Sequence, residues 1–446
     1  MKKAVLRLSL FRKLNVNMCK YLSFIGIFCF TFLSFSQSEK GRVTVEKLCS
    51  PEFHGRGYVN GGDSLAANFL ANEFKQIGCR FFKNNPFQSF QFNVNTFPNI
   101  VSLTIDGREL KPGVDFVVSY DSPAFQGDNM VFLNVSTQDI FDGKILKNKI
   151  SALAMRGEKK SVGLLFTFPE WKGDTLKAAK ELAKSLNTAM PIIEVVNDKF
   201  TWSVAQKQVA FPKYTVQQSA FNAHAESWKV STVVQAKIKS HIARNVIAYA
   251  PAKKKSKKYF VFSAHYDHLG RMGQEAFFPG GNDNASGTAM LLEMARYYIQ
   301  NPADVNVVFI AFAGEEVGLL GSEYYTAHPI FPLNKIQFLF NLDIMGSGED
   351  GATIVNATVF PKEFEFLKSI NAANEFLPKI NARGKAANSD HYFFTEAGVP
   401  AFFIYTMGPN RHYHDTGDTY ENLSFAKFDA ICKLLIEFQK GLGKVK

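Results

Sequence analysis

The residues of this 446-residue chain that could do chemistry include five potential metal ligands, all between positions 265 and 414. Imidazole and carboxylate donors in this mixture suit zinc, with cobalt or manganese as substitutes. One carboxylate that serves two ions would hold them roughly 3.5–4 Å apart, as in two-metal hydrolases. We therefore expect a two-metal hydrolytic site, with Glu315 as its general base and with His265, Asp283, Glu316, Asp343 and His414 as ligands.

Asp267 lies two residues beyond His265, a spacing that returns the side chain to the same side of an extended segment. Its carboxylate is therefore expected to orient the imidazole. Asp418 and Thr419 are expected to shape the loop after His414 rather than bind metal. Three further histidines are not expected to be ligands, because the set is complete without them: His268, His391 and His412.

Each candidate also has a structural interpretation. Asp283 could cap the helix that follows it, and Glu315 and Glu316 could occupy a first helical turn, where the helix dipole favours acids. However, several acids and imidazoles that converge on one sheet edge would repel each other, or lose solvation, without cations between them. The joint pattern therefore favours a metal site.

The segment from residue 243 to the end predicts an α/β fold with a mostly parallel mixed sheet flanked by helices. Apolar runs of buried-strand length at 259–264, 305–313, 336–342 and 399–405 alternate with helical patterns at 285–300, 318–327, 361–375, 390–396 and 425–442. Ligands of such sheets bind beyond the carboxyl ends of the strands. His265, Glu315 with Glu316, and Asp343 each follow the end of a predicted strand.

The segment 88–238 has a different texture and predicts a smaller β-rich inserted domain that shapes access to the site. Short strands at 101–105, 130–135, 162–168 and 192–196 are separated by Gly, Asp and Pro turns, with one clear helix at 175–186. Residues 37–87, with helical patterns at 43–49 and 63–78, and 239–446 would then form the catalytic domain.

Residues 1–36 are expected to be a signal peptide, so the protein would be exported to a periplasm or outside the cell. The apolar stretch from Tyr21 to Phe35 is too short for a membrane span, and no stable membrane anchor is expected. Met18 is an alternative start. Six of the 51 basic residues and none of the 40 acidic ones lie in this segment, so the remainder has a net charge of +5. That value is too mild to indicate nucleic-acid binding.

Three cysteines remain after this segment. An oxidising compartment would allow one disulfide, for which proximity in sequence favours Cys49 and Cys79, and the sequence leaves open whether these two are bonded.

Several motifs resemble those of the M28 zinc metallopeptidases. They are Ser-Ala-His-Tyr-Asp-His-Leu-Gly (263–270), Asn-Asp-Asn-Ala-Ser-Gly-Thr-Ala (282–289), Phe-Ala-Gly-Glu-Glu-Val-Gly-Leu-Leu-Gly-Ser (312–322), Ser-Asp-His (389–391), Gly-Val-Pro (398–400) and the segment 414–419. The resemblance is strong over about 240–440 and looser over 45–80, through Gly55-Arg56-Gly57. The segment 88–238 is similar in placement to the protease-associated insert of that family.

This resemblance implies two zinc ions per chain and an exopeptidase that removes N-terminal residues from peptides. Water activated between the metals would attack the peptide bond, with Glu315 as base. The resemblance assigns one ion to His265, Asp283 and Asp343, and the other to Asp283, Glu316 and His414.

Alternatives remain open at this point. A glutaminyl-cyclase-like enzyme with one zinc, a receptor-like relative without activity, and a carboxypeptidase of the same family would share much of the pattern. The stretch from Ile404 to Arg411 departs from the Gly-x-His of many relatives, which leaves the substrate pocket undefined. Four residues near the site could contribute to that pocket: Arg383, Arg411, Tyr392 and Tyr405. The sequence leaves the oligomeric state and the side-chain preference open.

Overall fold

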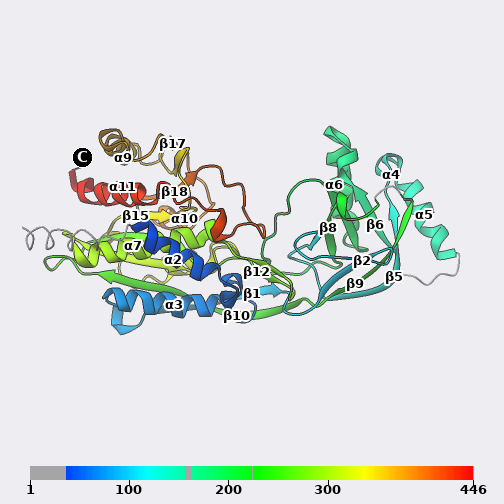
Figure 1. The fold of residues 1–446 in the computed structure, drawn as a ribbon, viewed down its shortest axis with the longest axis horizontal. Coiled ribbons are helices and arrows are strands. Elements are labelled where there is room, and N and C mark those ends of the chain that lie inside the picture. The colour runs from blue at the N-terminus through cyan, green and yellow to red at the C-terminus, as the bar shows by residue number, and fades with distance from the viewer. Residues whose placement is uncertain (1–36, 156–161, 223–224, 445–446) are drawn as a thin grey trace, which may run out of the picture.

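The computed structural model describes residues 37–155, 162–222 and 225–444, arranged as two lobes (Figure 1). Two long strands, β1 (Phe87–Thr96) and β10 (Lys237–Ala250), pair antiparallel and run from one lobe toward the other. The predicted signal peptide lies outside the described residues. Within them, no helix is long and apolar enough to cross a membrane.

The larger lobe is built on a mixed sheet of eight described strands, which confirms the predicted fold class. Its centre is parallel: β14, β11, β15 and β18 run side by side in the same direction. The order across the sheet is β1, β10, β14 (Asn306–Phe312), β11 (Tyr259–His265), β15 (Ile336–Leu342), β18 (Ala401–Met407), β16 (Gly351–Val355) and β17 (Ile380–Ala382).

Helices cover both faces of this sheet, which explains why its central strands read as continuous apolar runs. In β11, Phe260 and Phe262 face one core while Val261 faces the other. The larger core contains residues of α2 (Gln37–Cys49), α3 (Gly62–Ile77), α7 (Gly287–Gln300), α9 (Pro361–Asn374) and α11 (Phe428–Gly441). The smaller core contains residues of α8 (Leu320–Ala327) and α10 (His391–Glu396).

The smaller lobe contains a second mixed sheet of eight described strands, five of them short. Their order is β3 (Arg108–Leu110), β2 (Val101–Ile105), β9 (Ser227–Val234), β5 (Phe125–Asn134), β6 (Val162–Thr167), β7 (Ile192–Val196), β8 (Lys213–Gln217) and β4 (Phe116–Val118). The predicted helix at 175–186 is α6 (Gly173–Leu186), but α4 (Thr137–Phe141) and α5 (Gly143–Met155) were not predicted. The second sheet begins only at β2, since β1 belongs to the first.

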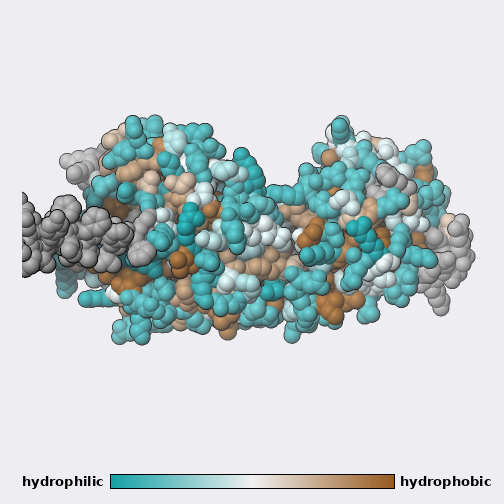
Figure 2. Space-filling view, viewed as in Figure 1, coloured by the Kyte–Doolittle hydropathy of each residue, from teal (hydrophilic) through white to brown (hydrophobic). Residues whose placement is uncertain are grey.

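The two lobes share a hydrophobic core. Most of it comes from the smaller lobe, including Phe97 and Trp202. The rest comes from a hairpin of the larger lobe, β12 (Gly270–Met272) and β13 (Ala276–Phe278), which contributes Met272 and Phe278. Outside this junction the surface is notched between the lobes and mostly hydrophilic on the face that Figure 2 shows.

The disulfide that proximity in sequence favours is not formed. Cys49 and Cys79 are both free and buried. Cys49 ends α2 and Cys79 follows α3, and both side chains belong to the larger core. Burial raises the pKa of both thiols to about 12, so they behave as small apolar groups rather than as reactive thiolates. Proximity in sequence did not place the two thiols together.

Candidate metal centre

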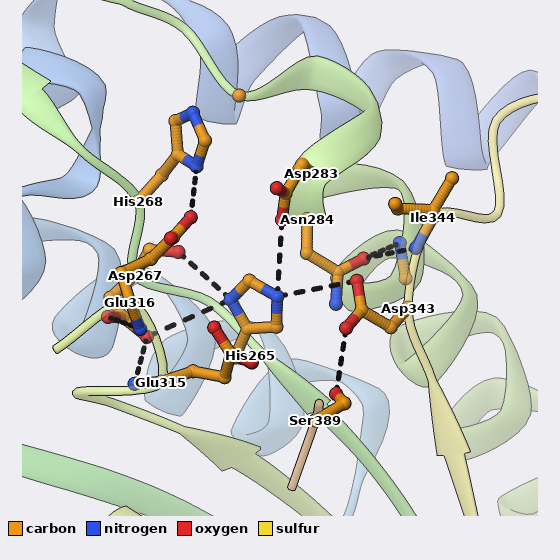
Figure 3. Close-up of polar contacts among 12 residues, drawn as sticks. His265, Asp267, His268, Asp283, Asn284, Glu315, Glu316, Asp343, Ile344 and Ser389 are labelled. Carbon is orange, nitrogen blue, oxygen red and sulfur yellow. Dashed lines mark hydrogen bonds and ion pairs between the residues drawn. The ribbon is translucent and has the colours of Figure 1, made fainter. Parts of the chain in front are cut away.

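The first group of predicted ligands meets where β11 and β15 end. His265 is the last residue of β11, and its Nε2 lies 3.3 Å from Oδ1 of Asp283 and 3.4 Å from Oδ1 of Asp343 (Figure 3). All three side chains are buried. The sheet therefore brings together residues that are 78 positions apart in the sequence.

The second group shares Asp283 with the first. Nε2 of His414 lies 3.1 Å from Oδ2 of Asp283 and 3.1 Å from Oε2 of Glu316. Each oxygen of the Asp283 carboxylate thus faces a different histidine. The structure brings all five predicted ligands into one cluster, with Asp283 at its centre.

His268 also belongs to this cluster, although it was not expected there. Its Nδ1 lies 2.6 Å from Oε1 of Glu316, and His268, Asp283 and Glu316 offer donor atoms within 4.8 Å of one another. His268 lies only three residues after His265, and the sequence alone does not show that both imidazoles reach the same cluster. The chain leaves β11 at His265, so His268 approaches Glu316 from the loop beyond.

Asp267 acts on the loop rather than on the imidazole ring. Nδ1 of His265 donates to the main-chain carbonyl of Asp267 at 3.2 Å, while the carboxylate is 3.9 Å away. That carboxylate instead accepts the hydroxyl of Tyr58 at 2.7 Å and the backbone N–H groups of Glu315 and Glu316 at 3.3 and 3.4 Å. Burial raises the pKa of Asp267 to about 6. The predicted contact with the ring is therefore made by its backbone.

Glu315 faces a pocket of about 260 Å³ beside the cluster. His265, Asp283, Asp343 and His414 line the same pocket, together with Ile344, Arg383, Asn388, Phe403, Tyr405 and Tyr413. Burial is the main cause that raises the pKa of Glu315 well above its usual range, and the neighbouring carboxylates of Glu316 and Asp343 add to it. A carboxylate with a raised pKa, open to a pocket, can accept and return a proton.

Hydrogen bonds hold the segment that carries Asp283. The carboxylate of Asp418 accepts the backbone N–H groups of Asn282 and Asp283 at 2.8 and 3.0 Å, so it holds this segment, whereas it was expected to shape the loop after His414. Asn284 donates to the carbonyl of Leu342 and accepts the N–H of Ile344, which ties this segment to the end of β15. Burial raises the pKa of Asp418 to about 7.

A chain of buried hydrogen bonds supports Asp343 from behind. Ser263 donates to Asn341, Asn341 donates to Ser389, and Ser389 donates to Oδ2 of Asp343, each at 2.7 Å. Sequence reasoning assigned no role to these side chains. The motif Ser-Asp-His at 389–391 was the one signal that could have indicated Ser389.

The donor set fits zinc ions. Nδ1 of His265 and Nδ1 of His414 each donate to a main-chain carbonyl, of Asp267 and Trp202 respectively. Each Nε2 therefore faces two carboxylate oxygens with at most one proton to share. Oδ1 of Asp343 has no hydrogen-bond partner in the described part of the chain. Bare imidazole nitrogens and carboxylate oxygens converging in this way are the ligand set of a zinc site.

The remaining predicted neighbours divide between the pocket and the surrounding structure. Arg383 and Tyr405 line the pocket, whereas Arg411 donates to the carbonyl of Gly408. His412 pairs with Asp415 at 2.9 Å. His391 is buried against Phe403, and burial lowers its pKa to about 3.

Comparisons with known proteins find similarity over the segment that carries the cluster. The model of "Peptidase family M28" matches residues 245–439. Aminopeptidase YwaD of Bacillus subtilis is 36% identical over 170 residues, which are 36% of this chain and 36% of the relative. Leucine aminopeptidase 1 of Arthroderma otae is 28% identical over 222 residues, 46% of this chain and 59% of the relative. The aligned segments thus span less than two thirds of these relatives.

Solved structures show the same fold over most of the chain. A zinc aminopeptidase from Bacillus subtilis aligns with a TM-score of 0.62 and 19% identity, covering 91% of this chain and 95% of the other. A peptidase M28 precursor from Shewanella amazonensis aligns with a TM-score of 0.62 and 16% identity, covering 90% and 92%. The residues that match the model of peptidase family M28, 245–439, carry all five predicted ligands and Glu315.

Proposed function

We propose that this protein is a two-zinc exopeptidase that removes N-terminal residues from peptides. The observation that carries the proposal is the Asp283 carboxylate, whose two oxygens each face the Nε2 atom of a different histidine. A carboxylate placed between two such nitrogens is suited to bridge two ions. His265 and Asp343 would complete one site, and Glu316 and His414 the other. His268 is an additional donor near the second.

Bound zinc would polarise the carbonyl of the scissile peptide bond and lower the pKa of water in the site. Glu315 would take a proton from that water as it attacks the carbonyl, and would return the proton to the leaving amine. Asp267 would hold the backbone of Glu315 in place through its carboxylate. The order of proton transfers is that of general base followed by general acid catalysis.

The pocket supports action at chain ends. The wall of the pocket includes the apolar Ile344 and Phe403, which suit an apolar side chain of a substrate. The carboxylates of Glu315, Asp283 and Asp343, which also line the pocket, would attract the ammonium group of a peptide N-terminus. One observation favours a second candidate, a carboxypeptidase: Arg383 in the same wall offers a guanidinium to a C-terminal carboxylate.

Export is a separate part of the proposal. It rests on the signal-peptide pattern of residues 1–36 and leads to a periplasmic or extracellular enzyme. Amino-terminal sequencing of the protein recovered from the producing cells would show a chain that begins at Gln37. A mature chain that retains residues 1–36 would contradict it.

Digestion of a mixed peptide pool tests the activity. Mass spectrometry would show ladders shortened from the amino end with zinc and intact peptides with a chelator. Glu315→Gln would keep its two zinc ions but lose most turnover, about 10²–10⁴-fold. Glu323→Gln, an exposed acid on α8, is the matched control and would digest normally. Ladders from the carboxyl end would establish the carboxypeptidase, and peptides left intact with zinc would contradict both.

A further inference from the structure

The histidine of the second group is held by the other lobe. Trp202 lies in the segment 197–212, which we call the Trp202 loop, between β7 and β8 of the smaller lobe. Its backbone N–H donates to the carbonyl of His414 at 2.9 Å. Its own carbonyl accepts the Nδ1–H of the His414 ring at 3.0 Å. Two residues 212 positions apart are thus joined by hydrogen bonds in both directions.

The second of these bonds determines what His414 can do. Because a carbonyl only accepts, Nδ1 must carry a proton, so in the neutral ring that binds a metal the lone pair lies on Nε2, toward Asp283 and Glu316. The same bond fixes the plane of the ring. Hydrogen bonds of this kind to the far nitrogen of a ligating histidine set both its tautomer and its orientation. His414 also has a positive φ of 53°, so its backbone needs support from its surroundings.

Trp202 is itself anchored to both lobes. Its indole ring stacks on Phe278 of β13 with 4.7 Å between ring centres and 9° between planes. Its Nε1 donates to the carbonyl of Val118 in β4 at 2.7 Å. Only 4% of its surface is exposed. The ring therefore fixes the position of its backbone between a hairpin of the larger lobe and a strand of the smaller one.

Other contacts of the Trp202 loop reach the segments that carry His414 and Glu316. Lys199 donates to the carbonyl of Arg411 at 2.5 Å and pairs with Asp415 at 3.1 Å, on either side of His414. Gln206 donates to the carbonyl of Val317, directly after the Glu315–Glu316 pair. Lys199 and Gln206 are exposed, so we expect their hydrogen bonds to hold these segments less firmly than the buried Trp202 does.

We propose that Trp202 is a positioning residue for the metal ligand His414, and that the smaller lobe is in this way part of the metal centre. The inference rests on the proposed function, because it requires that His414 bind zinc. It goes beyond access control, the role expected for the insert. The lobe would set the affinity for the second ion through one backbone carbonyl.

The test measures zinc binding directly. The full chain is stripped of metal, titrated with zinc against a chromophoric chelator, and analysed for zinc per chain. Trp202→Ala is expected to weaken the second zinc site by about 10–100-fold while leaving the first unchanged. Trp202→Phe keeps the stacking on Phe278 and should restore most of the affinity. Trp228→Ala is the matched control, since Trp228 belongs to the same core but bonds to Asn222.

A pair of surface variants keeps the test open if Trp202→Ala fails to fold. Lys199→Ala removes two bonds to the segment around His414 and should weaken the second site several-fold. Lys207→Ala changes an equally exposed lysine of the same loop and should not. Normal zinc affinity at both sites in the Trp202 and Lys199 variants would overturn the inference. So would a loss of affinity at the second site in Trp228→Ala that equals the loss in Trp202→Ala. A wild-type chain that binds no zinc would instead overturn the proposed function, and the inference with it.

Discussion

Glu315 and Glu316 are neighbours of the same type, and their different contacts separate their roles. The carboxylate of Glu316 is held by His268 at 2.6 Å and His414 at 3.1 Å. Burial raises its pKa, but the two imidazoles outweigh burial and lower the pKa of Glu316 to about 2. Glu315 lacks such partners and its pKa is raised. The first residue is suited to carry protons and the second to remain an anionic ligand.

Asp267 provides a prediction at this scale. The two carboxylate oxygens of Asp267 accept the backbone N–H groups of Glu315 and Glu316, one each. In Asp267→Asn, an amide nitrogen replaces one of these oxygens, so one of the two bonds is lost and the segment 315–316 should shift. We expect kcat to fall about 10–100-fold with zinc content unchanged. Tyr58→Phe, which removes one hydrogen bond to the same carboxylate, should give a smaller loss. Steady-state kinetics with zinc analysis checks both. Loss of zinc with normal turnover per bound ion would contradict the role.

The sequence indicated the cluster because its acids and imidazoles follow strand ends, and the sheet edge then brings them together. It named His265 but missed His268, because only the path of the loop after β11 shows that the second imidazole also reaches the cluster. Nor could it find Ser389 or the carbonyl of Trp202. Their roles come from distances across the fold and from backbone atoms that every residue type carries.

At the scale of elements, Arg56 links the segments around the cluster. It is fully buried, and its guanidinium donates to the carbonyls of Leu48, Tyr266, Pro279 and Gly280. The flanking Gly55 and Gly57 lie against the backbone of Gly270, where a side chain would overlap it. This explains the Gly-Arg-Gly motif: the glycines allow close approach, and the arginine bonds the loops before Asp283 and after His265.

We predict that Arg56→Lys destabilises the protein strongly. A lysine cannot reproduce the planar fork of donors, and buried carbonyls would lose their partners. The expected loss is more than about 3 kcal/mol in the free energy of unfolding, measured by denaturant titration. Arg80→Lys, which changes an exposed arginine, is the control. Equal stability of both variants would show that other contacts hold these loops.

Helices and strands with a clear apolar pattern could be predicted from the sequence. Elements whose formation depends on packing against distant parts of the chain could not. β11, β14 and β15 were found because both of their faces are buried, which makes each strand a continuous apolar run. The helices α4 and α5 were missed. α4 has only five residues, too few for an apolar period to be recognised, and a single residue separates it from α5. The hairpin β12–β13 is short as well, and its apolar residues are explained only by the core that it shares with the other lobe.

At the scale of the whole molecule, the cluster is a concentration of buried charge whose cost depends on metal. In the metal-free chain, burial raises the pKa of Asp390 and of Asp418 to about 7. Burial alone would lower the pKa of His414, but the carboxylates of Glu316 and Asp283 raise it to about 11. Buried carboxylates with raised pKa values destabilise the fold once ionised. An imidazolium with a raised pKa stabilises the fold fully below the pKa of the unfolded histidine, and less as pH rises toward the folded pKa.

The signs of these shifts give a pH dependence. For Asp390 and Asp418, stability is lost as pH rises through about 7, where the folded carboxyls ionise. For His414, the contribution is complete below the unfolded value of about 6.5 and declines as pH rises toward 11. All three groups therefore make the metal-free chain more stable at pH 6 than at pH 8. Glu316, with a lowered pKa, contributes to stability equally at both pH values because it is ionised throughout this range.

Removal of zinc should accordingly lower the melting temperature of the full chain, and more at pH 8 than at pH 6. With free zinc at about 1,000 times its dissociation constant, binding adds roughly 4 kcal/mol, which corresponds to a shift of about 5 °C for a chain of this length. Calorimetry of zinc-loaded and chelator-treated protein at both pH values measures the difference. The gap narrows at pH 6 for two reasons: protons stabilise the metal-free cluster, and they compete with zinc for its ligands. A gap that is equal at both pH values, or wider at pH 6, would mean that the cluster is not the group of residues that responds to zinc.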